Sequence, residues 1–330
     1  MTTNPTLTPA AAALHRDALV LDAHADTLTE MTDRGYDLDQ GLPGTQLDLA
    51  RCAQGVLDAQ VFTCFVHPSY VPGRAADRVR AMLDTMDRQF ALFPDRLVLC
   101  RGPGDIVAAR EAGLLGVLLA IEGGHAIEDD LDVLREFHGR GVRTMTLTWN
   151  NSNEWADGCG GHQPHGGLTV RGREVVAAME ELRVVVDISH VARSTFDDVL
   201  SIAQRPVIAS HSCARALRDH PRNLDDDQLR AVAQGGGVAC VNFYPGFLVD
   251  DGDCTLEHLL DHVMHFVDVA GPEHVGLGSD FDGIPESPVG MADVSDLPQL
   301  TAGLAERGLN ESAIRALLGG NLLRIFDGDL

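Results

Sequence analysis

The feature that most constrains the fold is a repeated alternation of short apolar runs with longer helical stretches. Eight runs rich in Val, Ile and Leu occur, at residues 18–23, 56–65, 115–121, 142–147, 184–188, 206–209, 237–243 and 274–278. This alternation is typical of βα units that build a parallel sheet. A seven-stranded open sheet is an alternative, but eight alternations favour closure. We therefore expect an α/β fold, a (β/α)8 TIM-type barrel.

The stretches between these runs have the apolar spacing of amphipathic helices. Residues 256–267, for example, carry one apolar stripe at i, i+3 and i+4 spacing. Helices are expected at residues 75–92, 129–140, 171–182, 194–204, 225–234 and 256–269, and at 296–307 and 311–319 after the last strand. The chain has 330 residues, 45% of them hydrophobic, enough for one barrel domain over residues 1–330. Residues 1–13 are expected to be a flexible or peripheral segment.

The charge of the chain excludes two classes of partner. The formal net charge is -24, from 49 acidic and 25 basic residues. Such a surface repels phosphate backbones and anionic lipid headgroups, so neither nucleic acid nor a membrane is expected as a partner. Residues 1–13 lack a basic start and an apolar run for export or anchoring, which favours a cytoplasmic location. The seven cysteines include no C-x-x-C pair and are expected to be reduced, mostly buried thiols.

Imidazole and carboxylate side chains gather at the expected carboxyl ends of the strands, the face that carries the active site in barrel enzymes. They are His24 and Asp26 after the first run, Glu122 after the third, His190 after the fifth, His211 after the sixth and Asp280 after the eighth. Such nitrogen and oxygen ligands suit zinc and related divalent ions, and a carboxylate can bridge two metals that bind a hydroxide at neutral pH. One histidine at a strand end is more often structural, but so many together favour a two-metal site.

Two further groups of histidines have other interpretations. His258, His262 and His265 are spaced to lie near one another on a helix. They lie largely opposite the apolar stripe of residues 256–267, so a solvated face is favoured over a metal site. His162 and His165 occupy a glycine-rich loop on the expected active face, where loop structure and substrate contact are equal alternatives.

Several short segments together resemble one protein family. They read DAHAD (22–26), IEGGH (121–125), WADG (155–158), GLT (167–169), GRE (172–174), VVDISHV (185–191), SHS (210–212), RNL (222–224), VNFY (241–244), GSDFDG (278–283) and GNLLRIF (320–326). In order and spacing they are similar to the membrane (renal) dipeptidase family of zinc peptidases, which have amidohydrolase-type barrels of the metallo-dependent hydrolase type. The resemblance spans nearly the whole chain.

This resemblance implies roles for individual residues. It makes His24 and Asp26 ligands of one zinc ion, His190 and His211 ligands of a second, and Glu122 a catalytic bridge between them. It also implies that Asp280 is the catalytic proton shuttle. Arg222, which the residues alone would place on the surface, would bind the terminal carboxylate of the substrate, a task suited to a guanidinium fork. The family further implies two Zn2+ ions and a homodimer.

One position departs from the family pattern. These dipeptidases usually carry a histidine after the Leu-Thr of the fourth strand, where it helps to polarise the scissile carbonyl, but this chain has Trp149. An indole can donate one hydrogen bond but cannot accept a proton or carry a charge. Asn150, His162 or His165 could supply the missing contact, and Tyr244, in the matching segment 241–244, is a further candidate for substrate binding. The departure puts substrate choice in doubt more than metal binding.

The sequence therefore predicts a zinc-dependent dipeptidase whose substrate has an L- or D-residue at its C-terminal position. A metal-bridging hydroxide would attack the amide. A first alternative keeps the metals but changes the bond, to that of an N-acyl amino acid, a β-lactam or a lactone. A second alternative, of another class, is a non-catalytic metal-binding or peptide-binding protein. Replacement of a ligand or of Asp280 would favour it, and none is replaced.

Overall fold

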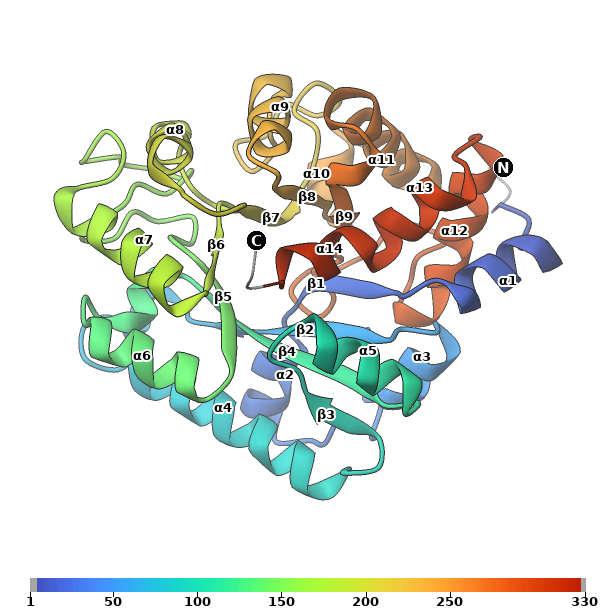
Figure 1. The fold of residues 1–330 in the computed structure, drawn as a ribbon, viewed down its shortest axis with the longest axis horizontal. Coiled ribbons are helices and arrows are strands. Elements are labelled where there is room, and N and C mark those ends of the chain that lie inside the picture. Colours follow the sequence, from blue (N-terminus) through green and yellow to red (C-terminus); the bar gives the residue numbers. More distant parts are fainter. Residues whose placement is uncertain (1–4, 328–330) are drawn as a thin grey trace.

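Eight parallel strands form a closed ring in the computed structural model, which describes residues 5–327 (Figure 1). They are β1 (Leu21–Ala25), β2 (Ala59–Phe65), β4 (Leu115–Glu122), β5 (Val142–Thr146), β6 (Val185–Asp187), β7 (Ile208–Ser212), β8 (Val238–Val241) and β9 (Val275–Leu277). Each pairs with its neighbour in this order, and β9 pairs with β1 to close the ring. The predicted (β/α)8 barrel is confirmed.

A ninth strand, β3 (Leu97–Leu99), was not expected from the sequence. It lies outside the ring and pairs with the beginning of β4, with Leu97 opposite Leu115. The next strand of the ring, β5, pairs with β4 only from Leu119 onward, so β3 covers the edge that β5 leaves open. Three residues are too few to show a recognisable apolar run in the sequence.

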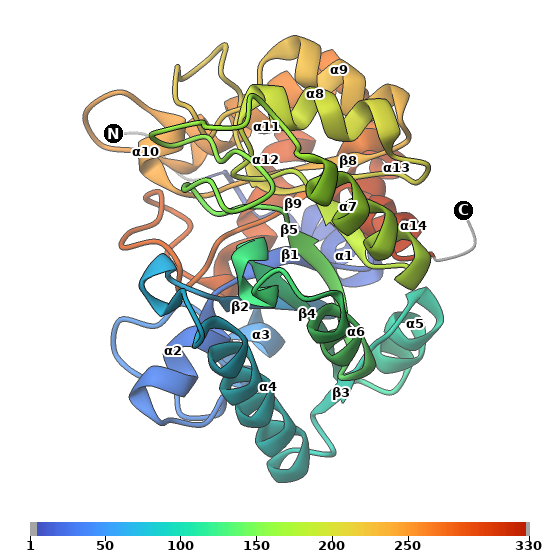
Figure 2. The same cartoon turned by 90° about the vertical axis from the view of Figure 1, so that its left-hand side faces the viewer.

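Helices surround the ring, and both views show α6, α7 and α8 following one another around its outside (Figures 1 and 2). The helices are α1 (Pro9–Asp17), α2 (Thr27–Arg34), α3 (Leu49–Gln54), α4 (Ala75–Leu92), α5 (Pro103–Glu111), α6 (Leu131–Gly139), α7 (Val170–Leu182), α8 (Arg193–Ile202), α9 (Asp226–Gln234), α10 (Pro245–Leu248), α11 (Leu256–Ala270), α12 (Leu297–Glu306), α13 (Glu311–Arg315) and α14 (Asn321–Ile325). Short 3-10 turns lie at η1 (Pro68–Tyr70), η2 (Gly124–Ile127), η3 (Pro272–His274) and η4 (Val294–Asp296). No described helix is long and apolar enough to cross a membrane.

The two ends of the chain differ in part from the expectation. Helix α1 includes residues 9–13 of the segment expected to be flexible or peripheral and packs against α12, whereas residues 1–4 lie outside the described residues. The single helix expected at 311–319 is instead α13 followed by a π-helical turn, Ala316–Gly320. At Gly319 a side chain would come within 2.6 Å of the carbonyl oxygen of Leu19, so the turn approaches the entry to β1 closely.

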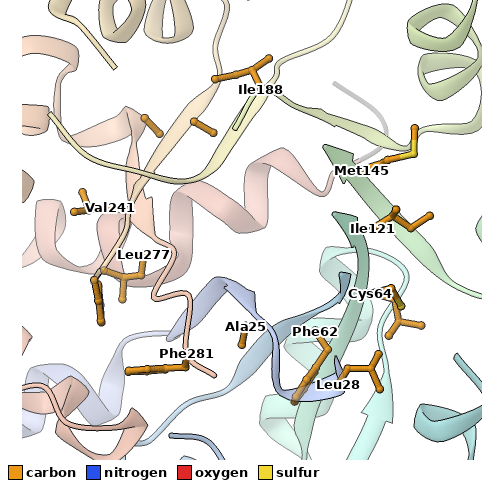
Figure 3. Close-up of a cluster of buried hydrophobic side chains, with 14 of the residues drawn as sticks. Ala25, Leu28, Phe62, Cys64, Ile121, Met145, Ile188, Val241, Leu277 and Phe281 are labelled. Atoms are coloured by element: carbon orange, nitrogen blue, oxygen red, sulfur yellow. The ribbon is translucent and has the colours of Figure 1, made fainter. Parts of the chain in front are cut away.

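Apolar side chains alternate between the inside and the outside of the ring. In β2, Ala59 and Val61 belong to the interior cluster, whereas Phe62 and Cys64 belong to the outer layer between strands and helices. Figure 3 shows this outer layer, which continues through Ile121 of β4. Because Leu118 and Ala120 of β4 face the interior, Glu122 at the end of the same strand does so too.

The amino end of the barrel is closed by apolar side chains of α14 and of the residue that follows it. Leu322, Ile325 and Phe326 join the interior cluster formed by the strands, and α14 lies against β1, β8 and β9. The opposite, carboxyl end of the ring carries the polar groups described below.

A close backbone approach at the end of β9 gives a test of this packing. A Cβ atom on Gly278 would overlap the carbonyl oxygen of Ser210 in β7. Overpacking typically costs about 1 to 3 kcal/mol, and a clash with backbone should reach at least the upper end of this range. We expect Gly278→Ala to lower the free energy of unfolding by about 3 kcal/mol or more in urea denaturation. Gly139→Ala, at the end of α6 where a Cβ meets nothing within 4 Å, is the control and should be neutral or stabilising by up to about 1 kcal/mol.

Candidate active site

Irregularities in two strands direct histidines into the mouth of the barrel. The register of β1 against β2 shifts between Asp22 and Ala25, so that three steps on β1 match two on β2. The same shift occurs in β7 between Ala209 and Ser212. Such bulges re-aim side chains and are common beside active sites. As a result His24 and His211 both face the interior, with their ring centroids 3.8 Å apart.

His190 is held in an unusual backbone conformation just after β6. Its φ angle of 68° lies in the left-handed region, which residues other than glycine rarely adopt. Two groups fix its carbonyl oxygen: the backbone N–H of Cys159 at 2.7 Å and the hydroxyl of Thr148 at 3.2 Å. The side chain is fixed as well, because its Nδ1 lies 2.9 Å from Oδ1 of Asn150.

Three ligand atoms converge on one point at the carboxyl end of the ring. Nε2 of His190 lies 2.7 Å from Oε1 of Glu122 and 2.8 Å from Nε2 of His211. Nε2 of His211 lies 3.5 Å from the same Glu122 oxygen. The other oxygen of Glu122 lies 3.6 Å from Nε2 of His24, which is 3.8 Å from Oδ1 of Asp280. The structure thus brings Glu122 between two groups of side chains.

The protonation of these groups leaves lone pairs facing one another. Burial and the nearby Arg222 lower the pKa of His190 to about 4, and burial and His24 lower the pKa of His211. Both imidazoles are therefore neutral. Each has a hydrogen-bond partner at Nδ1, Asn150 for His190 and Ser210 for His211, so each can keep its proton there and offer Nε2 as an acceptor. Neutral nitrogens this close to a carboxylate oxygen need a cation between them.

A second set of atoms, on the β1 side, also fits a metal ion. Ligand atoms of His24, Asp26 and Asp280 lie within 4.8 Å of one another, as do those of His24, Glu122 and His211. Nε2 of His24 and Oδ1 of Asp26 are buried without a hydrogen-bond partner, which is costly unless an ion satisfies them. A side chain on Gly283 would overlap the carboxylates of Asp26 and Asp280, so glycine leaves the space that these groups share.

Negative charge dominates this second set. Burial raises the pKa of Asp26 well above its usual range, and Glu122 raises it further. Burial also raises the pKa of Asp280 to about 6, while His24 opposes the change. Although burial opposes it, Glu122 and the two aspartates raise the pKa of His24 to about 10. Three buried carboxyl groups around one imidazole are matched better by divalent cations than by one proton.

Two residues that the sequence did not single out hold Asp280 and its loop. Asn242, at the end of β8, donates from Nδ2 to Oδ2 of Asp280 at 2.9 Å. The backbone N–H of Ser279 donates to Asp22 at 2.8 Å, which ties the loop after β9 to β1. Asn242 lies within the strand expected at 237–243, so its place at a strand end was a usable signal.

Arg222 is buried beside this cluster, with 5% of its surface exposed. Its Nη2 donates to the carbonyl oxygen of His211 at 3.0 Å, and the guanidinium lies over the ring of Phe247 at 5.4 Å. Its Nε–H has no partner among the described residues. Tyr244 packs edge-on against the same Phe247 ring. Arg222 is thus not a surface residue, and it keeps one donor free for a ligand.

The loop after β5 carries the remaining candidate substrate-binding residues, and only some of them lie near the cluster. Trp149 lies at the mouth, with its ring 6.2 Å from that of His190. Asn150 lies behind His190 as its hydrogen-bond partner. His162 and His165 are exposed, and His165 contacts the carbonyl oxygen of Asn153 at 2.9 Å, within its own loop. The loop therefore brings Trp149 and Asn150 to the cluster, but not these two histidines.

The expectation of a solvated histidine face on α11 is wrong for His262. This side chain is 1% exposed; it accepts from the backbone N–H of Ala214 at 2.9 Å and contacts the carbonyl oxygen of Leu248 at 3.0 Å. Burial lowers its pKa to about 4. It links α11 to the loop after β7 and to the end of α10, whereas His258 caps the start of α11 and His265 pairs with Asp226.

Comparison with known proteins identifies the family. The model of membrane dipeptidases, peptidase family M19, matches residues 9–328. An uncharacterised dipeptidase of Schizosaccharomyces pombe is 36% identical over 310 residues, which cover 88% of this chain and 74% of that protein. A second uncharacterised dipeptidase of this yeast is 35% identical over 300 residues, covering 86% and 73%.

A solved structure agrees in fold as well as in sequence. It is a metallopeptidase from Rhodobacter sphaeroides liganded with a phosphinate mimic of the dipeptide L-Ala-D-Ala. The two proteins are 28% identical with a TM-score of 0.87, over 94% of this chain and 98% of that one. The family match over nearly the whole sequence confirms the predicted resemblance: the chain belongs to the membrane dipeptidase family, peptidase family M19, and is a metallo-dipeptidase.

Proposed function

We propose that this metallo-dipeptidase uses two zinc ions to hydrolyse dipeptides with an L- or D-residue at the C-terminal position. The observation that carries the proposal is the convergence of His190 Nε2, His211 Nε2 and Glu122 Oε1 within 2.7 to 3.5 Å of one another. Imidazole nitrogen and carboxylate oxygen are the ligands that zinc takes in catalytic sites. The relative liganded with a mimic of L-Ala-D-Ala supports a D-residue as one accepted form.

The residues divide into two ligand sets that share one carboxylate. His24 and Asp26 would hold one ion, His190 and His211 the other, and Glu122 both. When bound, the ions supply Lewis acidity, which polarises the amide carbonyl and makes water a stronger acid. Homodimer formation and the cytoplasmic location are part of the same proposal and rest on the sequence and the family resemblance.

Asp280 is the proposed acid and base. Its Oδ2 accepts the hydrogen bond of Asn242, which fixes the carboxylate, while Oδ1 faces His24 across 3.8 Å. A carboxylate held at this position can take a proton from the attacking water and give it to the leaving amine. Arg222, which donates to the carbonyl oxygen of His211, would bind the terminal carboxylate through the Nε–H that the protein leaves free.

The metal content is the first prediction. Purified protein should bind close to two zinc equivalents by elemental analysis, and chelation should abolish hydrolysis of a dipeptide panel. His190→Ala should retain about one equivalent, because only one ligand set is broken. His162→Ala, on the exposed loop, should retain both. Full turnover by protein stripped of metal would disprove the proposal.

The second prediction concerns Arg222. Arg222→Met should reduce kcat/KM for free dipeptides by about 10- to 150-fold, since a charge-assisted hydrogen bond contributes about 1.5 to 3 kcal/mol. The C-terminal amides of the same dipeptides lack the carboxylate and should lose far less. If both substrate series lose activity equally, Arg222 has a structural role only.

The third prediction separates catalysis from metal binding. Asp280→Asn keeps the size of the side chain but cannot accept the proton, so kcat should fall by about two to four orders of magnitude while most of the metal is retained. Asp282→Asn, on the same loop, where the carboxylate accepts from Thr27 and Gln46, is the control and should lose less than about tenfold. Loss of zinc in Asp280→Asn would make Asp280 a ligand, and a normal kcat with both metals would remove it from the mechanism.

A further inference from the structure

Three aromatic rings form a continuous wall at the mouth of the barrel. Phe65 ends β2, His67 follows it, and Trp149 lies in the loop after β5. The ring centroid of Trp149 lies 5.3 Å from that of Phe65 and 6.0 Å from that of His67, while Phe65 and His67 meet edge-on at 6.4 Å. Phe65 and Trp149 are half-buried and His67 is exposed, so the wall offers apolar surface to the outside.

The wall adjoins the metal cluster and is fixed from behind. Trp149 stands 6.2 Å from the ring of His190. The next residue, Asn150, is anchored twice, by the backbone N–H of Gly160 to its carbonyl oxygen at 2.8 Å and by its side chain to His190. His67 caps η1, since its Nδ1 accepts from the backbone N–H of Ser69 at 3.2 Å. The wall is thus preorganised, so little ordering cost opposes a contact with a ligand.

Phe65 and Arg222 lie on opposite sides of the ring, whereas Trp149 follows β5, two strands from β7. The strands follow one another in the order β1, β2, β4, β5, β6, β7, β8 and β9, so β2 is four strands from β7 in either direction. Phe65 ends β2, whereas Arg222 follows β7 and donates to the carbonyl oxygen of His211. The metal cluster lies between them. A substrate that spans the mouth therefore has one end at Arg222 and the other at the wall.

We propose that the wall formed by Phe65, His67 and Trp149 binds the side chain of the N-terminal residue, and that the enzyme selects dipeptides in which this residue is large and apolar or aromatic. The inference rests on the proposed function, which puts the C-terminal carboxylate at Arg222 and the amide at the cluster. The N-terminal residue then extends toward β2 and β5. Aromatic faces bind aliphatic and aromatic groups by burial and by offset or edge-on stacking.

The wall also accounts for Trp149 where the family usually has a histidine. A histidine there would present a polar, protonatable ring toward His190, whereas the indole presents a larger apolar face. Each methylene buried on such a face favours binding by about fourfold. A leucyl or phenylalanyl residue should therefore be preferred over a glycyl residue by at least about tenfold in kcat/KM.

The test measures kcat/KM for zinc-loaded enzyme on dipeptides that share a C-terminal alanine and carry Gly, Leu, Phe or Lys at the N-terminal position. The wild type should prefer Leu and Phe over Gly by at least tenfold. Trp149→Ala and Phe65→Ala should each reduce the Leu-to-Gly ratio by about fivefold or more, whereas Trp149→Phe should keep most of it. Zinc content and Tm of each variant show that the cluster and the fold are intact.

Phe247→Ala is the matched control, because this ring lies under Arg222 on the opposite side of the mouth. It should lower turnover of all four substrates together and leave the Leu-to-Gly ratio unchanged. A wild type without preference, or a ratio unaffected in both Trp149→Ala and Phe65→Ala, would overturn the inference. A preference for Lys would overturn it as well, since the wall would then bind a cation through its ring faces.

A binding measurement separates this inference from the proposed function. Of the two tryptophans, Trp155 is 1% exposed and Trp149 is at the mouth. A phosphinate mimic of Leu-Ala should change the tryptophan fluorescence of the wild type and not of Trp149→Ala, and it should bind at least tenfold more tightly than the mimic of Gly-Ala. If these results are obtained but no dipeptide is hydrolysed, the proposed function is wrong, whereas the inference about the aromatic wall is supported. If dipeptides are hydrolysed but the two mimics bind equally well, only the inference about the wall is wrong.

Discussion

The rest of the site depends on one constraint: the barrel buries acceptor atoms against one another at its mouth. Glu122 Oε1 faces two neutral imidazole nitrogens, and Asp26 has an oxygen that no described donor satisfies. Exposed to water such atoms would cost nothing, but in a buried position each unsatisfied one is expensive. Bound metal would satisfy these atoms, and the two ions proposed above would do so for all of them together. The fold therefore forms a site for positive charge that the side chains of the protein do not supply.

Holding acceptors in this arrangement requires a rigid surrounding layer. His190 and Asp280 both adopt positive φ angles, at 68° and 65°, which side chains other than glycine adopt at a cost. Hydrogen bonds compensate: Asn150 and Cys159 hold His190, and Asn242 holds Asp280. The same partners keep the ligand atoms oriented, as outer partners of metal ligands commonly do. Strain at the mouth is thus compensated by contacts from neighbouring loops.

Much of this arrangement could be predicted from the sequence, because the apolar runs that form the strands, and the polar residues that directly follow them, can be recognised in a single sequence. The eight runs, and the gathering of His24, Glu122 and His211, followed from that pattern. The two bulges did not, because a shift of register depends on the neighbouring strand and leaves no mark on the alternation of one strand. The burial of His262 was missed for a similar reason: its partners, Ala214 in the loop after β7 and Leu248 at the end of α10, belong to other elements.

Trp149 and Asn150 are adjacent residues with different contacts. Trp149 lies at the mouth of the barrel beside the ring of His190, whereas the side chain of Asn150 is hydrogen-bonded to His190. A change of backbone at one position moves the other. Replacements at position 149 will therefore be accepted or rejected according to what stands at 150, and the effect of a pair will differ from the sum of its single effects. Among relatives the two positions should vary together. This coupling restricts how substrate specificity can evolve in such an enzyme, because a substitution at position 149 that favours a new substrate must leave the hydrogen bond between Asn150 and His190 intact.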